Sequence, residues 1–174
     1  MAKLGKFDSD ANALKQRIES HSKYAKYDIN EWIFKHLELR KKLSVLDLGC
    51  GTGKQTLPMA RIVGNEGTVF SVDISRDALQ ELSKNAAIEG LTDNIKTVES
   101  GLDNLNGIFK KNFFDRILSS YSLYYSQNPE KVLEKINYSL KDGGIFFYCG
   151  PMLDNNMEIR KFHYSLKGIK TIPE

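Results

Sequence analysis

The sequence predicts an α/β fold, a three-layer sandwich with a mainly parallel sheet between layers of helices. From about residue 44 onward, short β-branched or aromatic runs alternate with amphipathic helical stretches, which is the pattern of repeated strand–helix–strand units. The first run leads into a loop with glycine at alternate positions, Gly49, Gly51 and Gly53. At 174 residues the chain is about one domain long. We therefore expect a single domain with one main site.

Five strands are expected from short runs that are rich in Val, Ile, Thr, Phe and Tyr. They cover residues 44–49, 68–73, 94–100, 114–120 and 144–149. These strands are separated by helical stretches, so they are expected to pair in parallel.

The helices between the strands are predicted from apolar residues at helical spacing. A helical run with Leu57 at its start follows the glycine loop. Residues 75–89 form a second helix that stops at Gly90, a common residue just past a helix end. A third helix begins at Pro129 and closes at residues 141–144, ahead of the fifth strand.

The two ends of the chain carry further helical stretches. Residues 10–20 and 29–40 precede the first strand. We expect residues 1–43 to form a helical cap or lid on the carboxyl edge of the sheet, with residues 44–174 as the ligand-binding unit. An amphipathic stretch also covers about residues 155–166, and no further pair of strands is expected after it.

Composition excludes several classes of protein. The longest apolar stretch, residues 144–153, is about half of the roughly 20 residues that a membrane helix needs, and the first residues do not form a secretory signal. A cytoplasmic protein without a membrane span is therefore expected. Cys50 and Cys149 are far apart and lack metal-ligand spacing. The net charge of +3 is too small to indicate nucleic-acid binding.

The glycine loop favours a nucleoside ligand without phosphates. A dinucleotide fingerprint would need glycine at Lys54, and a phosphate-binding loop would need Ser or Thr at Gln55. Asp73 ends the second strand, where a carboxylate can accept hydrogen bonds from both ribose hydroxyls of an adenosine. The loop and Asp73 together predict an adenosine site.

Here the sequence resembles the class I S-adenosylmethionine-dependent methyltransferases. The resemblance rests on VLDLGCGTG (residues 45–53), FDRILSSYSLYY (residues 114–125) and LKDGGIFFYCGP (residues 140–151), and it extends over about residues 44–151. It implies a Rossmann-like fold, S-adenosylmethionine as cofactor and S-adenosylhomocysteine as product. The region is most similar to the small-molecule, ubiquinone-biosynthesis-like branch, because no Asn-Pro-Pro-Tyr or Asp-Pro-Pro-Tyr element follows the fourth strand.

The resemblance also implies which residues bind the cofactor. Glycine-loop residues would flank its methionine part, Asp73 would bind the ribose, Ile74 would pack on the adenine, and the Leu102 amide would contact the adenine ring. Gly101 stands where relatives carry an acidic residue for the adenine amino group, so Asp103 is a substitute candidate. The expected cofactor-binding set is Asp47, Gly49, Cys50, Gly51, Gly53, Asp73, Ile74, Leu102 and Ser119.

Several of these residues also have a purely structural interpretation. Asp47 holds either the loop or, through water, the cofactor's ammonium group, and a buried capping role remains open. Asp73 is also next to the helix-capping position Ser75.

No catalytic residue follows from the pattern. In-line methyl transfer from a sulfonium depends on alignment and desolvation, so a catalytic triad is not required. His21 is a candidate general base because it lies in the expected lid, and Tyr121 is a second candidate. Tyr121, Tyr124 and Tyr125 either wall a substrate pocket or pack a helix edge, and Tyr24 and Tyr27 either serve the lid or pack.

The expected function is methyl transfer to a small-molecule acceptor, with two alternatives. One is an RNA or protein methyltransferase that uses the basic N-terminal helices. The other is a non-catalytic S-adenosylmethionine-binding or partner subunit, or a truncated enzyme, because relatives usually add a sixth and a seventh strand after the fifth. An exposed fifth strand would favour a homodimer formed through the sheet edge.

Overall fold

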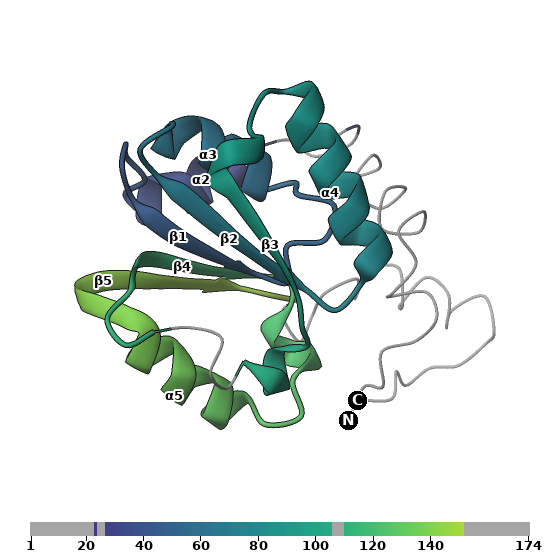
Figure 1. Ribbon diagram of the computed structural model, residues 1–174. Coiled ribbons are helices and arrows are strands. Elements are labelled where there is room, and N and C mark those ends of the chain that lie inside the picture. The colour runs from purple at the N-terminus through teal and green to yellow at the C-terminus, as the bar shows by residue number, and fades with distance from the viewer. Residues whose placement is uncertain (1–22, 24–26, 106–109, 152–174) are drawn as a thin grey trace, which may run out of the picture.

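The computed structural model describes residue 23 and residues 27–105 and 110–151, which form one α/β domain (Figure 1). Its five strands are all parallel and lie in the order β3-β2-β1-β4-β5. Their bounds are β1 Ser44–Leu48, β2 Thr68–Asp73, β3 Ile95–Glu99, β4 Phe114–Ser120 and β5 Leu140–Cys149. The chain runs outward from β1 in one direction and then returns to the other side of β1 with β4. Ligands of open α/β sheets bind at such a reversal, beyond the carboxyl ends of the central strands.

The bounds of the helices are α2 Ile29–His36, α3 Thr56–Val63, α4 Arg76–Ile88 and α5 Pro129–Ser139, with short 3₁₀ turns η1 Thr92–Asn94, η2 Leu102–Asn104 and η3 Leu123–Tyr125. Helices α3, α4 and α5 lie at the expected positions, whereas α2 begins where expected and ends at His36, before the expected end at residue 40. Helix α4 begins where the Ser75 side chain accepts a hydrogen bond from the Ala78 amide, and the chain leaves it through Gly90 at φ +69°. The expected α/β sandwich is confirmed.

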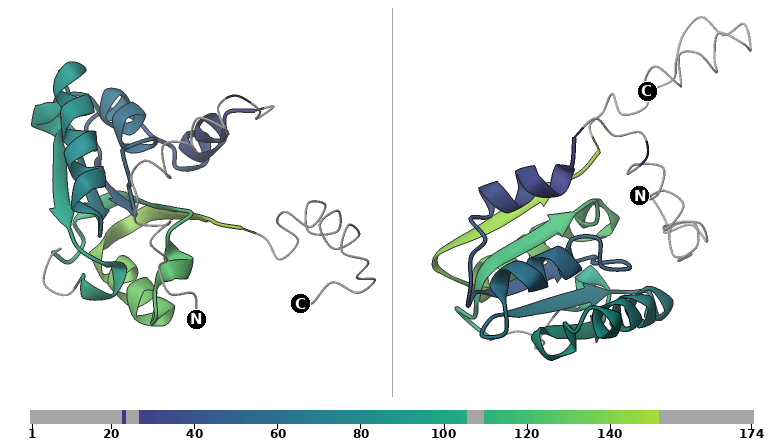
Figure 2. Two further views of the ribbon diagram at one scale, coloured as in Figure 1. Left: turned by 90° about the vertical axis from the view of Figure 1, so that its right-hand side faces the viewer. Right: turned by 90° about the horizontal axis from the view of Figure 1, so that it is seen from above.

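The helices cover the two faces of the sheet unequally (Figures 1 and 2). Helices α2, α3 and α4 share one apolar cluster with residues of β1 and β2, for example Ile33, Met59 and Leu82. On the other face, Val132 and Ile136 of α5 join a second cluster with η2, η3 and strand residues. The sheet is therefore the middle layer of three, and the Rossmann-like expectation is confirmed.

Helix α2 lies on a face of the sheet, and only its first turn reaches the carboxyl edge. Asn30 in this turn donates to the Lys54 carbonyl at 3.3 Å and accepts from Gln55 at 3.2 Å. At the other end, Leu37 is fully buried and its carbonyl accepts from the Arg116 guanidinium. The helix thus forms part of the main core. Among the described residues of the expected cap, those of this first turn reach the site, and the cap itself stays a prediction. Residues 10–20 and 155–166 lie outside the described residues.

Strand β5 is the outer strand of the sheet among the described residues. It is longer than expected because Leu140 already pairs with Phe114, and a bulge then shifts the register so that Ile145 pairs with Arg116. Beyond β5 only residues 150 and 151 are described, so the expected absence of a sixth and a seventh strand stays a prediction. No helix in the described part of the chain has the length and apolarity to cross a membrane.

Candidate adenosyl-cofactor site

The loop after β1 turns back over the end of β2. Gly49 and Cys50 both donate their amides to the Val72 carbonyl, at 2.8 and 3.0 Å. Gly49, Gly51 and Gly53 have φ values of +75°, +53° and +93°, a region that other residues rarely adopt. This succession of left-handed residues lets the loop turn tightly at the carboxyl edge of the sheet.

Two of these glycines are also required by close packing inside the protein. A Cβ atom on Gly49 would lie 2.2 Å from the Cβ of Ser122, and one on Gly53 would lie 2.4 Å from a methyl carbon of Leu82. Neither space is open to a ligand. Gly49 and Gly53 therefore shape the loop by contacts with the protein, and a direct contact of either residue with a cofactor stays a prediction.

Asp73 joins the end of β2 to the glycine loop. One carboxylate oxygen accepts from the Gly51 amide at 2.8 Å, and the other accepts from the Ser75 amide at 2.9 Å. A carboxylate oxygen can accept more than one hydrogen bond, so the group retains capacity for ribose hydroxyls. Asp73 is half-buried. Its position at the tip of β2 beside the loop fits the ribose-binding role that the sequence predicts.

An apolar surface follows Asp73. Ile74 is 56% exposed, unusual for a large aliphatic side chain, and its terminal carbon lies 3.5 Å from the point where a Cβ on Gly101 would sit. Gly101 directly precedes η2, so the amide of Leu102 lies at the same edge. Ile74 beside a bare glycine backbone offers a flat contact for an aromatic base. The residues of this surface fit an adenine ring.

The carboxylate of Asp103 accepts three hydrogen bonds from the protein itself. The donors are the Ser126 hydroxyl at 2.6 Å and the amides of Gln127 and Asn128 at 3.1 and 3.2 Å. These hydrogen bonds and the nearby Lys135 lower the pKa of Asp103, and they outweigh the raising effect of desolvation. Asp103 thus ties the turn after β3 to the loop before α5. The structure thus gives Asp103 a structural role, and the adenine contact considered from the sequence stays a prediction.

Asp47 lies under the glycine loop with almost no exposure. Its carboxylate accepts from the Thr56 hydroxyl at 2.6 Å, and Thr56 in turn accepts from Ser71 at 3.2 Å. Burial raises the pKa of Asp47 to about 7, with a further contribution from the charge of Asp73, against the lowering effect of the Thr56 hydrogen bond. Asp47 is therefore a buried carboxyl group whose charge costs free energy unless a cation lies near it.

Cys50 is an inert part of this loop. It is buried, and burial raises the pKa of its thiol, with further contributions from the charges of Asp47 and Asp73. A thiol of this kind is a poor nucleophile. Any contribution of Cys50 to cofactor binding would come from its backbone.

Polar and aromatic residues lie at the ends of β4 and β5 and in the turn after β4, at the same edge. Ser119 is fully buried, and its hydroxyl lies 2.8 Å from that of Ser122. Tyr121 has a φ of +55°, and the residue is 47% exposed. Tyr124 and Tyr125 are in ring contact with centroids 4.4 Å apart, and the space beside Gly150 is bounded by the hydroxyl of Tyr148 and the ring of Tyr124. Exposed aromatic side chains therefore gather beyond β4 and β5.

The histidines do not supply a base among the described residues. His36 is engaged with its own helix, since its Nδ1 lies 2.7 Å from the Trp32 carbonyl and its ring is 4.6 Å from the Trp32 ring. His21 and Tyr24 lie outside the described residues, so their proposed roles are untested. Tyr27 is 85% exposed.

Three residues of this region were not found from the sequence. Ser122 donates to the Leu48 carbonyl just before the glycine loop, and Asn30 donates to the Lys54 carbonyl just after it. Thr56 donates to Asp47 beneath the loop. A threonine at the head of the first helix after a glycine loop was a readable signal. Ser122 and Asn30 reach the loop from distant elements, so no local pattern marks them.

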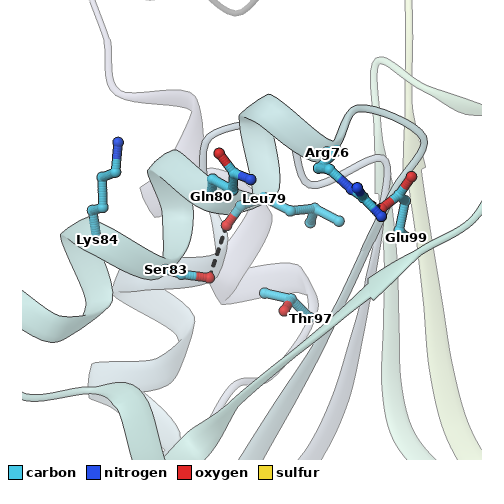
Figure 3. Close-up of a pocket in the computed structure, with 7 residues that line it drawn as sticks. All are labelled: Arg76, Leu79, Gln80, Ser83, Lys84, Thr97 and Glu99. Carbon is cyan, nitrogen blue, oxygen red and sulfur yellow. Dashed lines mark hydrogen bonds and ion pairs between the residues drawn. The ribbon is translucent and has the colours of Figure 1, made fainter.

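A separate open groove of about 450 Å³ lies between α4 and β3 (Figure 3). Arg76 and Glu99 form an ion pair of 2.8 Å at one end of it, and the Ser83 hydroxyl donates to the Leu79 carbonyl. None of its lining residues belongs to the glycine loop. The lining residues are Arg76, Leu79, Gln80, Ser83, Lys84, Thr97 and Glu99.

Comparison with known proteins agrees with this geometry. A family model described as a methyltransferase domain matches residues 39–167. A curated relative, the ubiquinone/menaquinone biosynthesis C-methyltransferase of Yersinia pestis biovar Antiqua, is 32% identical over 119 residues. That match covers 67% of this chain and 47% of the relative, so the chain spans about half the length of the curated relatives it matches.

Two solved structures show the same fold. One is a SAM-dependent methyltransferase from Aquifex aeolicus, with a TM-score of 0.65 at 23% identity over 76% of this chain and 68% of the other. The second is coclaurine N-methyltransferase bound to N-methylheliamine and SAH, with a TM-score of 0.62 at 23% identity over 69% and 34% of the two chains. With the family match, these findings confirm the resemblance drawn from the sequence. The chain belongs to the methyltransferase-domain family, among the class I S-adenosylmethionine-dependent methyltransferases.

Proposed function

We propose that this chain binds S-adenosylmethionine at the glycine loop and transfers its methyl group to a small-molecule acceptor, leaving S-adenosylhomocysteine. The observation that carries the proposal is the hydrogen bond between Gly51 and Asp73. It holds a carboxylate at the tip of β2 beside a loop with little side-chain bulk. This arrangement suits the hydroxyls of a ribose.

Each part of the site has a role in this proposal. Asp73 binds the ribose, Ile74 and the Leu102 amide contact the adenine, and the glycine loop flanks the methionine part. Asp47 supplies negative charge below the loop, where a cation would offset the cost of its burial. When bound, the cofactor supplies a methyl group on a positively charged sulfur.

The protein's part in the chemistry is alignment and exclusion of water. An in-line displacement needs the acceptor atom on the side of the methyl group away from the sulfur. Tyr121 and Tyr124 stand at the carboxyl end of β4, where an acceptor approaching the site would meet them. A Tyr121→Phe variant decides whether the Tyr121 hydroxyl moves a proton. Full activity in that variant limits the residue to binding.

The acceptor class is suggested by the relatives and by the aromatic side chains. The curated relatives are named as C-methyltransferases of ubiquinone and menaquinone biosynthesis. In this chain, Tyr121, Tyr124 and Tyr148 are each 40 to 47% exposed. Flat aromatic rings stack on such side chains. We therefore favour a small molecule with an aromatic or quinol ring.

A transfer assay with labelled cofactor tests the proposed activity. The protein is incubated with methyl-labelled S-adenosylmethionine and, in separate reactions, with small-molecule extracts, total RNA or total protein. Label in a small molecule supports the proposal. Label in RNA or protein would favour the alternative methyltransferases, and cofactor binding without any transfer would identify a binding subunit.

A further inference from the structure

Ser122 is the residue through which the turn after β4 touches the glycine loop. Its Cβ occupies the space that Gly49 leaves free, since a Cβ on Gly49 would lie 2.2 Å from it. Ser122 is only 6% exposed, and it comes from the far side of the strand-order reversal. The bare face of a loop glycine is therefore the contact point between the cofactor loop and the turn that carries Tyr121.

The hydroxyl of Ser122 adds hydrogen bonds to this contact. It lies within hydrogen-bonding distance of both the Leu48 carbonyl and the Ser119 hydroxyl. A carbonyl only accepts and a hydroxyl has one hydrogen, so Ser122 donates to Leu48 and accepts from Ser119. Leu48 is the last residue of β1, directly before the glycine loop. The hydroxyl thus fixes Ser122 to the point at which the loop begins.

A left-handed turn at Tyr121 brings Ser122 to this position. Tyr121 has a φ of +55°, a strained conformation for a tyrosine, and its amide donates to the Cys149 carbonyl at 2.8 Å. The turn leaves the Tyr121 ring partly exposed while Ser122 is buried. The Ser122 carbonyl then accepts from the Tyr125 amide, which forms η3 and places Tyr124.

We propose that Ser122 is a positioning residue: it couples binding of the cofactor to ordering of the acceptor-facing turn, residues 121–126. This inference rests on the proposed function, because it requires the glycine loop to bind the adenosyl cofactor. A ligand that holds the loop still would hold Gly49 and Leu48, and through them Ser122. The aromatic side chains of the turn would then be ordered when the cofactor is present.

Hydrogen–deuterium exchange with S-adenosylhomocysteine as the probe tests this inference. In the unaltered protein, the ligand should slow exchange in residues 49–53 and also in residues 121–126. In Ser122→Ala, residues 49–53 should keep their protection, while the ligand-dependent protection of residues 121–126 should fall about fivefold, as expected for one lost hydrogen bond. A merely structural role would instead speed exchange in both segments with or without ligand.

Ser83→Ala is the matched control, because it removes a hydroxyl that donates to a carbonyl on α4, in the groove shown in Figure 3. It should behave as the unaltered protein does. If Ser122→Ala does not fold, Ser122→Cys, with a weaker donor, gives the same comparison.

The outcomes separate this inference from the proposed function. Equal ligand-dependent protection of residues 121–126 in the unaltered protein and the Ser122 variant would overturn the inference. Protection of residues 49–53 alone in the unaltered protein would overturn it as well, while leaving cofactor binding intact. No protection anywhere would overturn the proposed function itself.

Discussion

The carboxylate of Asp73 accepts a hydrogen bond of 2.8 Å from the amide of Gly51. This bond joins the tip of β2 to the loop that leaves β1, and it sets both sides of the candidate cofactor site. Because Gly51 is in a left-handed conformation, its amide turns toward the neighbouring strand end. The relationship gives the loop a defined shape before any ligand arrives, and several measurable consequences follow.

The first prediction concerns pH and Asp47. Its pKa is raised from an ordinary 3.8 to about 7 in the folded protein, so the folded state binds the proton more tightly than the unfolded state. Stability from this group is complete below about pH 4 and falls as the pH rises toward 7, by up to about 4 kcal/mol. Asp47→Asn should remove this slope. Urea unfolding between pH 4.5 and 8.5 measures it, and equal slopes in both proteins would refute the raised pKa.

The raised pKa of Asp47 also predicts how the affinity for the cofactor depends on pH. A bound cation near Asp47 favours its charged form, so affinity for S-adenosylmethionine should rise as the pH rises through about 7. Asp47→Asn should bind more weakly and lose this dependence. Calorimetric titrations at pH 6 and pH 8 give the comparison. Affinity that does not change with pH in the unaltered protein would place the cation away from Asp47.

Substitutions at two glycines separate backbone strain from steric overlap. Gly64 and Gly53 both have positive φ, but a Cβ on Gly64 would meet nothing within 4 Å, whereas one on Gly53 would meet Leu82 at 2.4 Å. Gly64 has a ψ of −174°, a combination that essentially only glycine adopts, so Gly64→Ala should lower the free energy of unfolding by about 1 to 3 kcal/mol. Gly53→Ala should lower it by about 1 to 3 kcal/mol more. Equal losses in urea unfolding would show that Leu82 moves aside at little cost.

Asp103 offers a test of a structural against a ligand-binding role. Its bonds to Ser126 and to the amides of residues 127 and 128 predict that Asp103→Ala lowers the melting temperature. Because its pKa is lowered, the stability it contributes is present above its unfolded pKa and is lost as the pH falls through the folded pKa. The variant should bind S-adenosylhomocysteine nearly as well as the unaltered protein. A large loss of affinity with an unchanged melting temperature would restore the adenine contact.

We still predict a homodimer, because β5 is the outer strand of the described sheet. Among the described residues it pairs only with β4, and an open strand edge favours pairing with another chain. Light scattering of the full chain measures its molar mass in solution. A dimer is expected, and a monomer at all concentrations would show that this edge is covered or blocked.

Much of the fold follows from local sequence patterns, and the exceptions have physical causes. The strands and helices after residue 44 are marked by apolar spacing, Ser75 and Gly90 marking the ends of α4. Helix α2 ends at His36, before residue 40 where spacing alone placed it. Glu38 adopts a φ of +48°, and the buried Arg116 binds the Leu37 carbonyl at the helix end. That contact joins segments far apart in the chain, so the spacing of apolar residues carries no sign of it.

In the candidate site, too, some residues could be predicted from local sequence patterns and others could not. Asp73 was predicted because a strand end after a glycine loop has a recognisable pattern, and Ile74 because the family resemblance implies it. The roles of Asp103 and Ser122 depend on turns that bring distant segments together. A serine after a tyrosine has no distinctive signal. Its position depends on the left-handed conformation of Tyr121, which the sequence does not indicate.

Calorimetric titration with S-adenosylhomocysteine tests the central claim most directly. The unaltered protein should bind it, and Asp73→Ala should weaken binding by about 1 to 3 kcal/mol. Asp93→Ala removes an exposed carboxylate next to β3 and should bind as the unaltered protein does. Equal affinity in the Asp73 and Asp93 variants, or tight binding of a nicotinamide or triphosphate nucleotide in place of the adenosyl ligand, would contradict the account.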